Sequence, residues 1–367
     1  MSNPKYFILQ WHITADCDYY CKHCYMLDEE SYSKELHNRL SYQKSIYLID
    51  DFISMTKSLS KRFSQNILPM INFSGGDPLL HGDFFKILNY ANSKGIKIGI
   101  LGNPTYINPS SAKQLKDNGV TKYQISLDGL EGTHDKLRKK GSFEQSIKAL
   151  SCLQKENIVT HVMFSLSKLN KDDLIPLMEL MIKKEIDKFI FTRVSFVGNA
   201  KKIHSKMQAL EYRELLLKIH NIYQSYANQG IKTKLGYKDH LWLLLHKELG
   251  LFKPNGSSNK IYGGCGIGIN FLVVLADGTV YACRRFPSPV GKVPDEKLYD
   301  IFLNSERLNY YRQYNNFELC KNCELLNYCR GCPAVSYGES YNYFAPDPQC
   351  WKECYNKTQQ NVYKLEF

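Results

Sequence analysis

The chain has 367 residues, 43% of them apolar, which is enough to fill the core of one large domain and a smaller one. Its net charge of +12 suits nucleic acid, an anionic membrane surface or an acidic protein partner, and because the basic residues are scattered, a solvated surface is the simpler interpretation. The first residues lack the features of a signal peptide and the run LWLLL is too short to span a bilayer, so we expect a cytoplasmic protein.

Short apolar runs rich in β-branched residues alternate with amphipathic stretches from residue 6 to about 195, which predicts repeated βα units around a parallel sheet. The predicted strands are 7–14, 67–74, 96–101, 122–127, 159–166 and 188–196. The predicted helices are 42–59, 83–94, 110–118, 143–156, 172–185 and 208–228. Six such units indicate an α/β fold, a partial (β/α)6 TIM-like barrel whose ligands gather where the strands end.

The pattern changes after about residue 230. The segments NGSSNK and GGCGIG mark a junction, and NFLVVLADGTVYAC predicts a hairpin that turns at Asp277 and Gly278. A short cysteine-rich tail follows. We therefore expect the barrel with a trailing helix in residues 1–230, a linker in 231–260, and a small cysteine-rich iron–sulfur domain in 261–367.

Twelve cysteines in a cytosolic chain of this size are more often metal ligands or catalytic groups than disulfides. Three lie near the N-terminus and eight lie between Cys265 and Cys354. Cys152 stands alone within a predicted helix, where we expect an inert, buried thiol.

The first cysteines, Cys17, Cys21 and Cys24, have the spacing C-x3-C-x2-C in the loop after the first strand. A cubane [4Fe–4S] cluster has four irons, so three thiolates leave one iron for a substrate such as S-adenosylmethionine. From the triplet alone, a zinc knuckle completed by His12 or His23 stays open as an alternative.

The segment CDYYCKHCY resembles the cluster loop of the radical SAM superfamily, in which the cluster cleaves S-adenosylmethionine to a 5′-deoxyadenosyl radical. The resemblance makes Cys17, Cys21 and Cys24 the catalytic cysteines and places His23 against the adenine. It also implies cofactor contacts: Gly75, Gly76 and Asp77 at the methionine amino group, Asn103, Ser126 and Asp128 near the methionine carboxylate and the ribose, and Arg138 at the carboxylate. For each of these polar residues a turn or a helix cap is the alternative role.

The C-terminal array resembles the SPASM domain of peptide-modifying radical SAM enzymes, which holds two auxiliary [4Fe–4S] clusters and brings the expected total to three. The resemblance implies an outer cluster on Cys320, Cys323, Cys329 and Cys350, and an inner cluster on Cys265, Cys283 and Cys332. The fourth iron of the inner cluster either has Cys354 as its ligand or stays open for a thiolate of the substrate. The array departs from the family in having two residues, Arg330 and Gly331, between Cys329 and Cys332, where three are commoner. Structural zinc sites are the alternative.

The resemblance covers residues 6 to about 356 and implies a maturase that abstracts hydrogen from a ribosomally made precursor peptide. We expect thioether formation first, and epimerisation or a carbon–carbon crosslink after it. A sulfatase-maturating enzyme that makes formylglycine is the alternative, although Arg284 and Arg285 follow Cys283 where that family has an aspartate. A nucleic-acid-modifying radical SAM enzyme and a noncatalytic zinc-binding interaction protein are more distant alternatives.

The expected partners are the precursor peptide and an electron donor such as flavodoxin or ferredoxin, with neither membrane nor nucleic acid. Many peptide maturases carry an N-terminal winged-helix domain that binds the leader peptide, and only sixteen residues precede Cys17, so we expect none fused here. A separate recognition protein or a basic surface including Lys201, Lys202 and Lys206 would then bind the leader.

Overall fold

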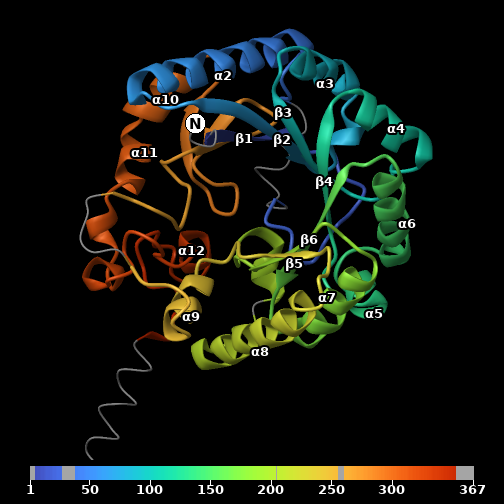
Figure 1. The fold of residues 1–367 in the computed structure, drawn as a ribbon. Helices are drawn as coiled ribbons and strands as arrows, with labels where there is room; N and C mark the ends of the chain where they lie inside the picture. The colour runs from blue at the N-terminus through green and yellow to red at the C-terminus, as the bar shows by residue number, and fades with distance from the viewer. Residues whose placement is uncertain (1–4, 27–37, 204, 255–259, 353–367) are drawn as a thin grey trace, which may run out of the picture.

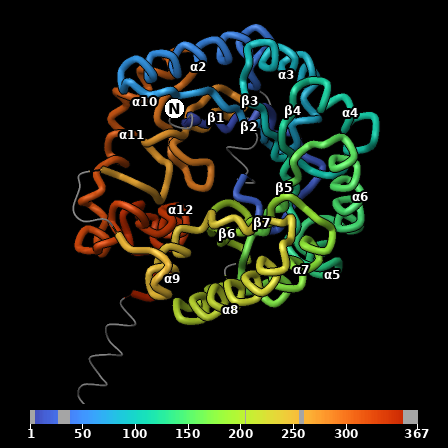
Figure 2. The backbone as a smooth tube through the Cα atoms, viewed as in Figure 1, coloured from blue at the N-terminus to red at the C-terminus, as the bar shows by residue number. Residues whose placement is uncertain are grey.

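The computed structural model describes residues 5–26, 38–203, 205–254 and 260–352. A ten-stranded sheet curves around the middle of the molecule in the order β10-β9-β8-β1-β2-β3-β4-β5-β6-β7, and helices cover its outer side (Figures 1 and 2). Neighbouring strands from β8 through β1 to β7 are parallel, while β9 and β10 are antiparallel additions at one edge. The α/β partial barrel is confirmed.

The predicted strands all form, with ends shifted by a few residues. The strands are β1 Lys5–Thr14, β2 Ile67–Gly75, β3 Lys97–Leu101, β4 Val120–Ser126, β5 Val159–Leu166, β6 Lys188–Arg193, β7 Lys234–Gly236, β8 Phe271–Val274, β9 Thr279–Tyr281 and β10 Pro289–Lys292. The short strand β7 adds a parallel strand beyond the six predicted ones.

The helices of the six predicted units also form. The helices are α2 Tyr42–Phe63, α3 Phe84–Ser93, α4 Pro109–Asp117, α5 Glu131–Leu137, α6 Ser142–Lys155, α7 Leu174–Lys183, α8 Ala209–Ala227, α9 Trp242–Glu248, α10 Leu298–Asn304, α11 Glu306–Tyr311 and α12 Pro333–Ser340. Cys152 lies in α6 as expected, but its side chain is only half-buried. None of the helices in the described part of the chain has the length and hydrophobicity that a membrane span requires.

The C-terminal segment is built onto the barrel through β8, which pairs in parallel with β1 over Ile8 to Trp11. The predicted hairpin is present between β8 and β9, and Gly278 adopts a left-handed φ of 86° in its turn. Helix α10 completes the attachment, because the ring of Phe302 packs 5.0 Å from that of Phe7. The cysteine-rich segment is thus fixed to the sheet edge beside the first strand.

Candidate active site

The three N-terminal cysteines lie in the loop that leaves β1, at the end of the barrel where the parallel strands finish. Cys21 is buried, and Cys17 and Cys24 are half-buried. Burial raises the pKa of Cys21 to about 12, and the negative charges of the Cys24 and Cys17 thiolates add to this rise. The three sulfurs are therefore within electrostatic reach of one another.

Gly75 and Gly76 bring the end of β2 directly against the start of this loop. A Cβ atom at Gly75 would lie 2.1 Å from the carbonyl oxygen of Thr14, and one at Gly76 would lie 2.0 Å from that of Asp16. Gly75 also has a left-handed φ of 141°. Any larger residue would push the strand away from the cysteine loop, so both glycines position the loop.

Asp77 is buried, and its two carboxylate oxygens differ. Oδ1 accepts a hydrogen bond from the backbone N–H of Leu79 at 3.1 Å, which is the capping role that the sequence left open. Oδ2 has no hydrogen-bond partner among the described residues. Burial raises the pKa of Asp77 to about 7. An unpaired buried acceptor at this position suits a cationic donor such as the amino group of S-adenosylmethionine.

Asn103 contacts the cysteine loop itself. Its Nδ2 donates to Cys17 Sγ at 3.4 Å and to Asp18 Oδ1 at 3.2 Å. Thr105 and Lys139 hold the other oxygen of Asp18, at 2.8 Å and 3.3 Å. Asp18 was not among the predicted site residues, although its place directly after the first cysteine was the available signal. Ser126 ends β4 half-buried.

Asp128 is fully buried and joins His23 of the loop to Arg138 at the end of α5. Its Oδ2 is 3.0 Å from His23 Nε2 and also accepts from Arg138 Nε, while Oδ1 accepts from the Ser165 backbone N–H at 2.7 Å. Burial alone would raise the pKa of Asp128, but Arg138 and then His23 outweigh it and hold the pKa well below its usual range. In this structure the carboxylate fastens the loop to the barrel, and its contact with the ribose stays a prediction.

Arg138 carries a positive charge to the thiol site. Its Nη1 lies 3.6 Å from Cys21 Sγ and its Nη2 lies 3.4 Å from His23 Nε2. Although burial would lower the pKa of Arg138, the Asp128 carboxylate and the nearby thiolate raise it, so the guanidinium stays charged. Most of the predicted cofactor residues therefore meet in one network around the three thiols.

The C-terminal cysteines divide into two groups. Burial raises the pKa of Cys265 to about 12, and the charges of Cys283 and Cys332 add to the rise, so the three thiols of the expected inner group lie within electrostatic reach of one another. Arg285 Nη1 donates to Cys332 Sγ at 3.3 Å. Cys354 lies outside the described residues, so its predicted role as a fourth ligand stays a prediction.

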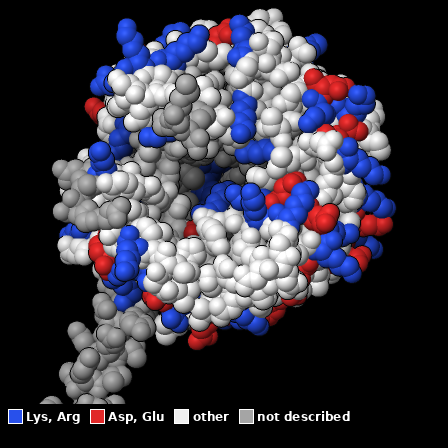
Figure 3. Space-filling model, viewed as in Figure 1, with Lys and Arg blue, Asp and Glu red and all other residues white. Residues whose placement is uncertain are grey.

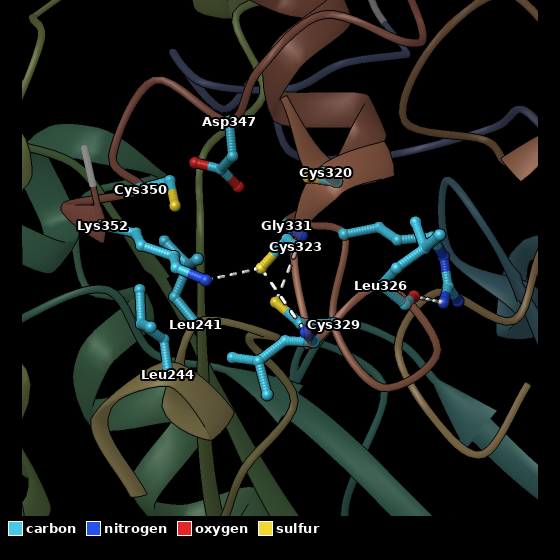
Figure 4. Close-up of a pocket in the computed structure, with 12 residues that line it drawn as sticks. Leu241, Leu244, Cys320, Cys323, Leu326, Cys329, Gly331, Asp347, Cys350 and Lys352 are labelled. Atoms are coloured by element: carbon cyan, nitrogen blue, oxygen red, sulfur yellow. Dashed lines mark hydrogen bonds between the residues drawn. The ribbon is translucent and has the colours of Figure 1, made fainter. Parts of the chain in front are cut away.

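Four further cysteines line a pocket (Figure 4), which is bordered by Asp347 and Lys352. This outer group consists of Cys320, Cys323, Cys329 and Cys350. Lys352 Nζ donates to Cys323 Sγ at 3.2 Å, and the Gly331 N–H donates to Cys329 Sγ at 3.3 Å.

The unusually short link between Cys329 and Cys332 is accommodated by left-handed backbone at Arg330 and Gly331, with φ of 104° and 60°. The Arg330 guanidinium is held by the carbonyls of Leu326 and Gly263, at 2.6 Å and 2.8 Å. The left-handed backbone that the shorter link requires is therefore stabilised by these two hydrogen bonds of the Arg330 side chain.

The donor sets fit iron–sulfur clusters. Thiols alone form groups of three, three and four, and N–H donors from Asn103, Arg285 and Lys352 point at their sulfurs. Within the described ranges, no three His, Cys, Asp or Glu side chains are arranged to hold a single metal ion. Thiolates are the ligands of cubane iron–sulfur clusters, so these donor sets fit such clusters.

Comparison with known families agrees with this division. Residues 11–181 match the Radical SAM superfamily, and residues 265–324 match SPASM, an iron–sulfur cluster-binding domain. The AdoMet-dependent heme synthase of Oleidesulfovibrio alaskensis is 27% identical over 95% of this chain and 88% of its own length. The mycofactocin maturase MftC of Mycolicibacterium smegmatis is 24% identical over 93% of this chain and 82% of its own.

The fold is also similar to that of Streptococcus suis SuiB. The SuiB structure bound to S-adenosylmethionine superimposes with a TM-score of 0.73 at 18% identity, covering 94% of this chain and 77% of SuiB. SuiB bound to its precursor peptide SuiA gives a TM-score of 0.69 at 17% identity, covering 94% of this chain and 75% of SuiB. At this level of identity the likeness concerns the fold.

Proposed function

The chain carries a radical SAM domain joined to a SPASM domain, and on this premise we propose that it matures a ribosomally made precursor peptide by forming a thioether. It is a radical SAM enzyme whose cofactors are S-adenosylmethionine, a [4Fe–4S] cluster and auxiliary iron–sulfur clusters. When bound, these cofactors supply the 5′-deoxyadenosyl radical and accept the electron left after hydrogen abstraction.

In the proposal, Cys17, Cys21 and Cys24 hold the catalytic cluster, and Asn103 and Arg138 stabilise its thiolates through N–H donors. The unpaired Oδ2 of Asp77 accepts from the methionine amino group. His23 and Ser126 complete the cofactor contacts. We further propose that residues 1–230 form the catalytic unit and residues 261–367 the auxiliary-cluster unit, connected by residues 231–260.

The inner thiol group carries the thioether proposal. It contains three cysteines in the described chain, whereas the outer group contains four. We propose that Cys354, which lies outside the described residues, is not the fourth ligand, so that three protein thiolates leave one iron of a cubane for a thiolate of the substrate. Arg285 lies beside Cys332 and supplies a cation that stabilises thiolate charge there.

Two findings support a peptide as substrate. MftC is named a maturase, and SuiB has been solved with its precursor peptide. The sulfatase-maturating alternative is disfavoured because Arg284 and Arg285 follow Cys283 where that family has an aspartate as its base. The Asp239 carboxylate, whose charge acts on Arg285, is already bound at 2.8 Å by Arg193 and is not free to act as a base instead.

A tetrapyrrole substrate is the second candidate. It rests on one observation, namely that the heme synthase of Oleidesulfovibrio alaskensis matches almost the whole chain at a slightly higher identity than MftC. This candidate predicts that a porphyrin, and not a cysteine peptide, is altered by the enzyme.

The test combines two measurements on the enzyme reconstituted anaerobically with iron and sulfide. After reduction with dithionite in the presence of S-adenosylmethionine, chromatography measures 5′-deoxyadenosine, and mass spectrometry follows the loss of two hydrogens from a cysteine-containing peptide encoded near the gene. The Cys17/Cys21/Cys24→Ala variant should give neither product. The Cys265/Cys283/Cys332→Ala variant should still form 5′-deoxyadenosine but no thioether. Peptide that stays unmodified while Fe-coproporphyrin III is consumed would reject the proposal.

A further inference from the structure

Basic side chains collect on the inner face of the barrel, below the thiol sites. In the register of the parallel strands, Gln124 lies opposite His161, His161 lies opposite Lys188, and Lys188 lies opposite Lys234. Register partners in a parallel sheet point to the same face, and Lys122 shares that face because it lies two residues before Gln124. Figure 3 shows a central hollow with blue lysine and arginine side chains within it and around it.

Glycines on the neighbouring strands make room for these lysines. A Cβ atom at Gly99 of β3 would lie 2.4 Å from Cε of Lys122, and one at Gly236 of β7 would lie 2.9 Å from Cε of Lys188. Each lysine side chain therefore lies across the strand next to its own. The inner face is built to accommodate both lysines inside the barrel.

The charge of Lys238, just after β7, interacts with that of Lys188 and with the inner thiols Cys283 and Cys332. Its side chain has exposed surface and yet is enclosed by protein atoms, as expected within a hollow. Enclosure, then the charge of Arg285, lowers the pKa of Lys238 to about 8, with Cys283 and Cys332 acting in the opposite direction. Burial and then the charge of Lys238 lower the pKa of Lys122 to about 8, and Lys97 and Lys188 add to this fall.

These cations have no acidic partner within 4 Å in the described part of the chain, because no salt bridge involves Lys122, Lys188 or Lys238. The carboxylate of Asp187 acts on His161, but it is already bound by the Thr160 backbone N–H and by Lys232. Asn72 Oδ1, on the same inner face, also lacks a hydrogen-bond partner among the described residues. Enclosed like charges repel each other, and an anion between them relieves that cost.

We propose that the hollow formed by Lys122, Lys188 and Lys238, with His161, binds a carboxylate side chain of the substrate, so that the precursor is an acidic peptide whose core segment enters the barrel here. The inference rests on the proposed function and specifies its substrate class. Binding a glutamate or aspartate in this hollow would place neighbouring residues of the peptide near the inner thiols, which Lys238 adjoins.

Carboxylates are the chemistry that this surface selects, and both candidate substrates carry them. The cations come from β4, β6 and the residues after β7, and the inner face around them carries the polar residues Gln10, Asn72 and Gln124. Fe-coproporphyrin III bears propionate carboxylates on its ring, so charge alone does not separate it from an acidic peptide. We commit to the peptide because the proposed function requires one, and porphyrin binding is an outcome of the test.

The test measures the binding of two fluorescein-labelled peptides to the reconstituted holoenzyme with S-adenosylmethionine by fluorescence anisotropy. One peptide repeats Gly-Ala-Cys-Glu five times, and the other has glutamine in place of glutamate. We expect the native enzyme to prefer the glutamate peptide by at least about tenfold, as for charge-assisted contacts in an enclosed site. Lys122→Met/Lys188→Met should abolish the preference, because methionine keeps the length of lysine and removes the charge.

A matched control removes the same charge from the surface. Lys113→Met/Lys148→Met neutralises two exposed lysines that pair with Asp117 and Glu144 on the barrel exterior, and it should keep the preference. Because the inner variant relieves repulsion, its thermal unfolding should not begin at a lower temperature than that of the native enzyme. A preference that survives in the inner variant, or falls equally in the control, overturns the proposal.

Two further results separate the inference from the proposed function. If Fe-coproporphyrin III, followed by absorbance, loses affinity in the inner variant while peptide binding is unchanged, the hollow serves a porphyrin and the acidic-peptide proposal is wrong. If the glutamate preference depends on Lys122 and Lys188 but no peptide is ever modified, the hollow binds carboxylates as proposed and the maturase function fails.

Discussion

The N-terminal thiol loop and the inner C-terminal thiol group differ in how their charges are balanced. At the loop, the cation beside Cys21 is Arg138, and a buried carboxylate, Asp128, compensates it. At the inner group, Arg285 approaches Cys332 and donates its other hydrogen bond to a backbone carbonyl, that of Arg193. The cation of the loop is paired directly with a carboxylate, whereas the cation of the inner group has a thiol and a backbone carbonyl as its hydrogen-bond partners.

The thiol loop and the inner thiol group are therefore suited to different tasks. A charge-balanced, hydrogen-bonded network is suited to holding a cofactor in one fixed orientation. An enclosed surface with excess positive charge is suited to receiving anions, including carboxylates and the thiolate form of a cysteine. The following predictions test the comparison, beginning with the largest expected effect.

Breaking the balanced pair should have the largest effect. Asp128→Asn leaves the buried Arg138 without its carboxylate, and we expect the free energy of unfolding to fall by about 3–5 kcal/mol. Urea denaturation of the cluster-free protein measures this fall. Asp117→Asn, which removes one partner of an exposed ion pair on α4, should cost less than about 1 kcal/mol. Equal costs for the two variants would show that Asp128 is not the anchor of the loop.

Removing the cation of the inner group should affect one cluster and spare the other two. Arg285→Met deletes the donor to Cys332 Sγ, a contact expected to contribute about 1.5–3 kcal/mol. We expect the iron content to fall by up to about four of about twelve irons per chain, while 5′-deoxyadenosine is still formed. Arg62→Met, at an exposed position near the end of α2, is the control. Full iron content in the Arg285 variant would contradict the expectation.

Asp77 is the exception to charge balance at the loop. Without S-adenosylmethionine, its pKa of about 7 means that the protonated form is stabilised, so its contribution to stability is complete below about pH 4 and is lost as the pH rises through 7. A bound ammonium group favours the carboxylate, so the affinity for S-adenosylmethionine should be about tenfold weaker at pH 6 than at pH 8.

Calorimetric titration at several pH values measures this dependence. Asp77→Asn cannot titrate and should bind S-adenosylmethionine with an affinity that changes little between pH 6 and 8. A native enzyme whose affinity is flat over this range would remove Asp77 from the cofactor contacts.

The fold was largely predictable because its signal is local. Each βα unit contains its own alternation of apolar residues, and each predicted strand and helix of the barrel formed near its expected ends. The pairing of β8 with β1 was not predictable, because it joins residues more than 260 positions apart and nothing in Ile8 or Phe271 specifies the partner. The left-handed residues Arg330 and Gly331 likewise follow from a tertiary constraint.

The site was predictable where it depends on spacing and not where it depends on convergence. The resemblance predicted three thiol groups. In the structure Cys17, Cys21 and Cys24 lie in one loop and Cys320, Cys323, Cys329 and Cys350 line one pocket, while their roles as ligands stay predictions. The basic residues, however, looked scattered and solvated, and the structure brings Lys122 and Lys188 onto one face of the sheet, where their charges and that of Lys238 act on one another. Lys122 and Lys188 lie on different strands, and only the sheet, through the intervening β5, puts them on the same face.

The smallest effect is expected at the exposed lysines near the end of β6. Lys206 lies 3.8 Å from Glu339, and Lys201 lies over the ring of Tyr341 at 5.4 Å, so Lys202 is the freest of the three predicted leader-binding residues. Lys201→Glu/Lys202→Glu should weaken binding of the glutamate peptide about two- to fivefold, because exposed charges are screened by water and salt. Raising the salt concentration should erase this loss while the preference conferred by the enclosed lysines persists. An unchanged affinity at low salt would leave leader recognition to a separate protein, and the enclosed cations alone would then account for selection of an acidic peptide.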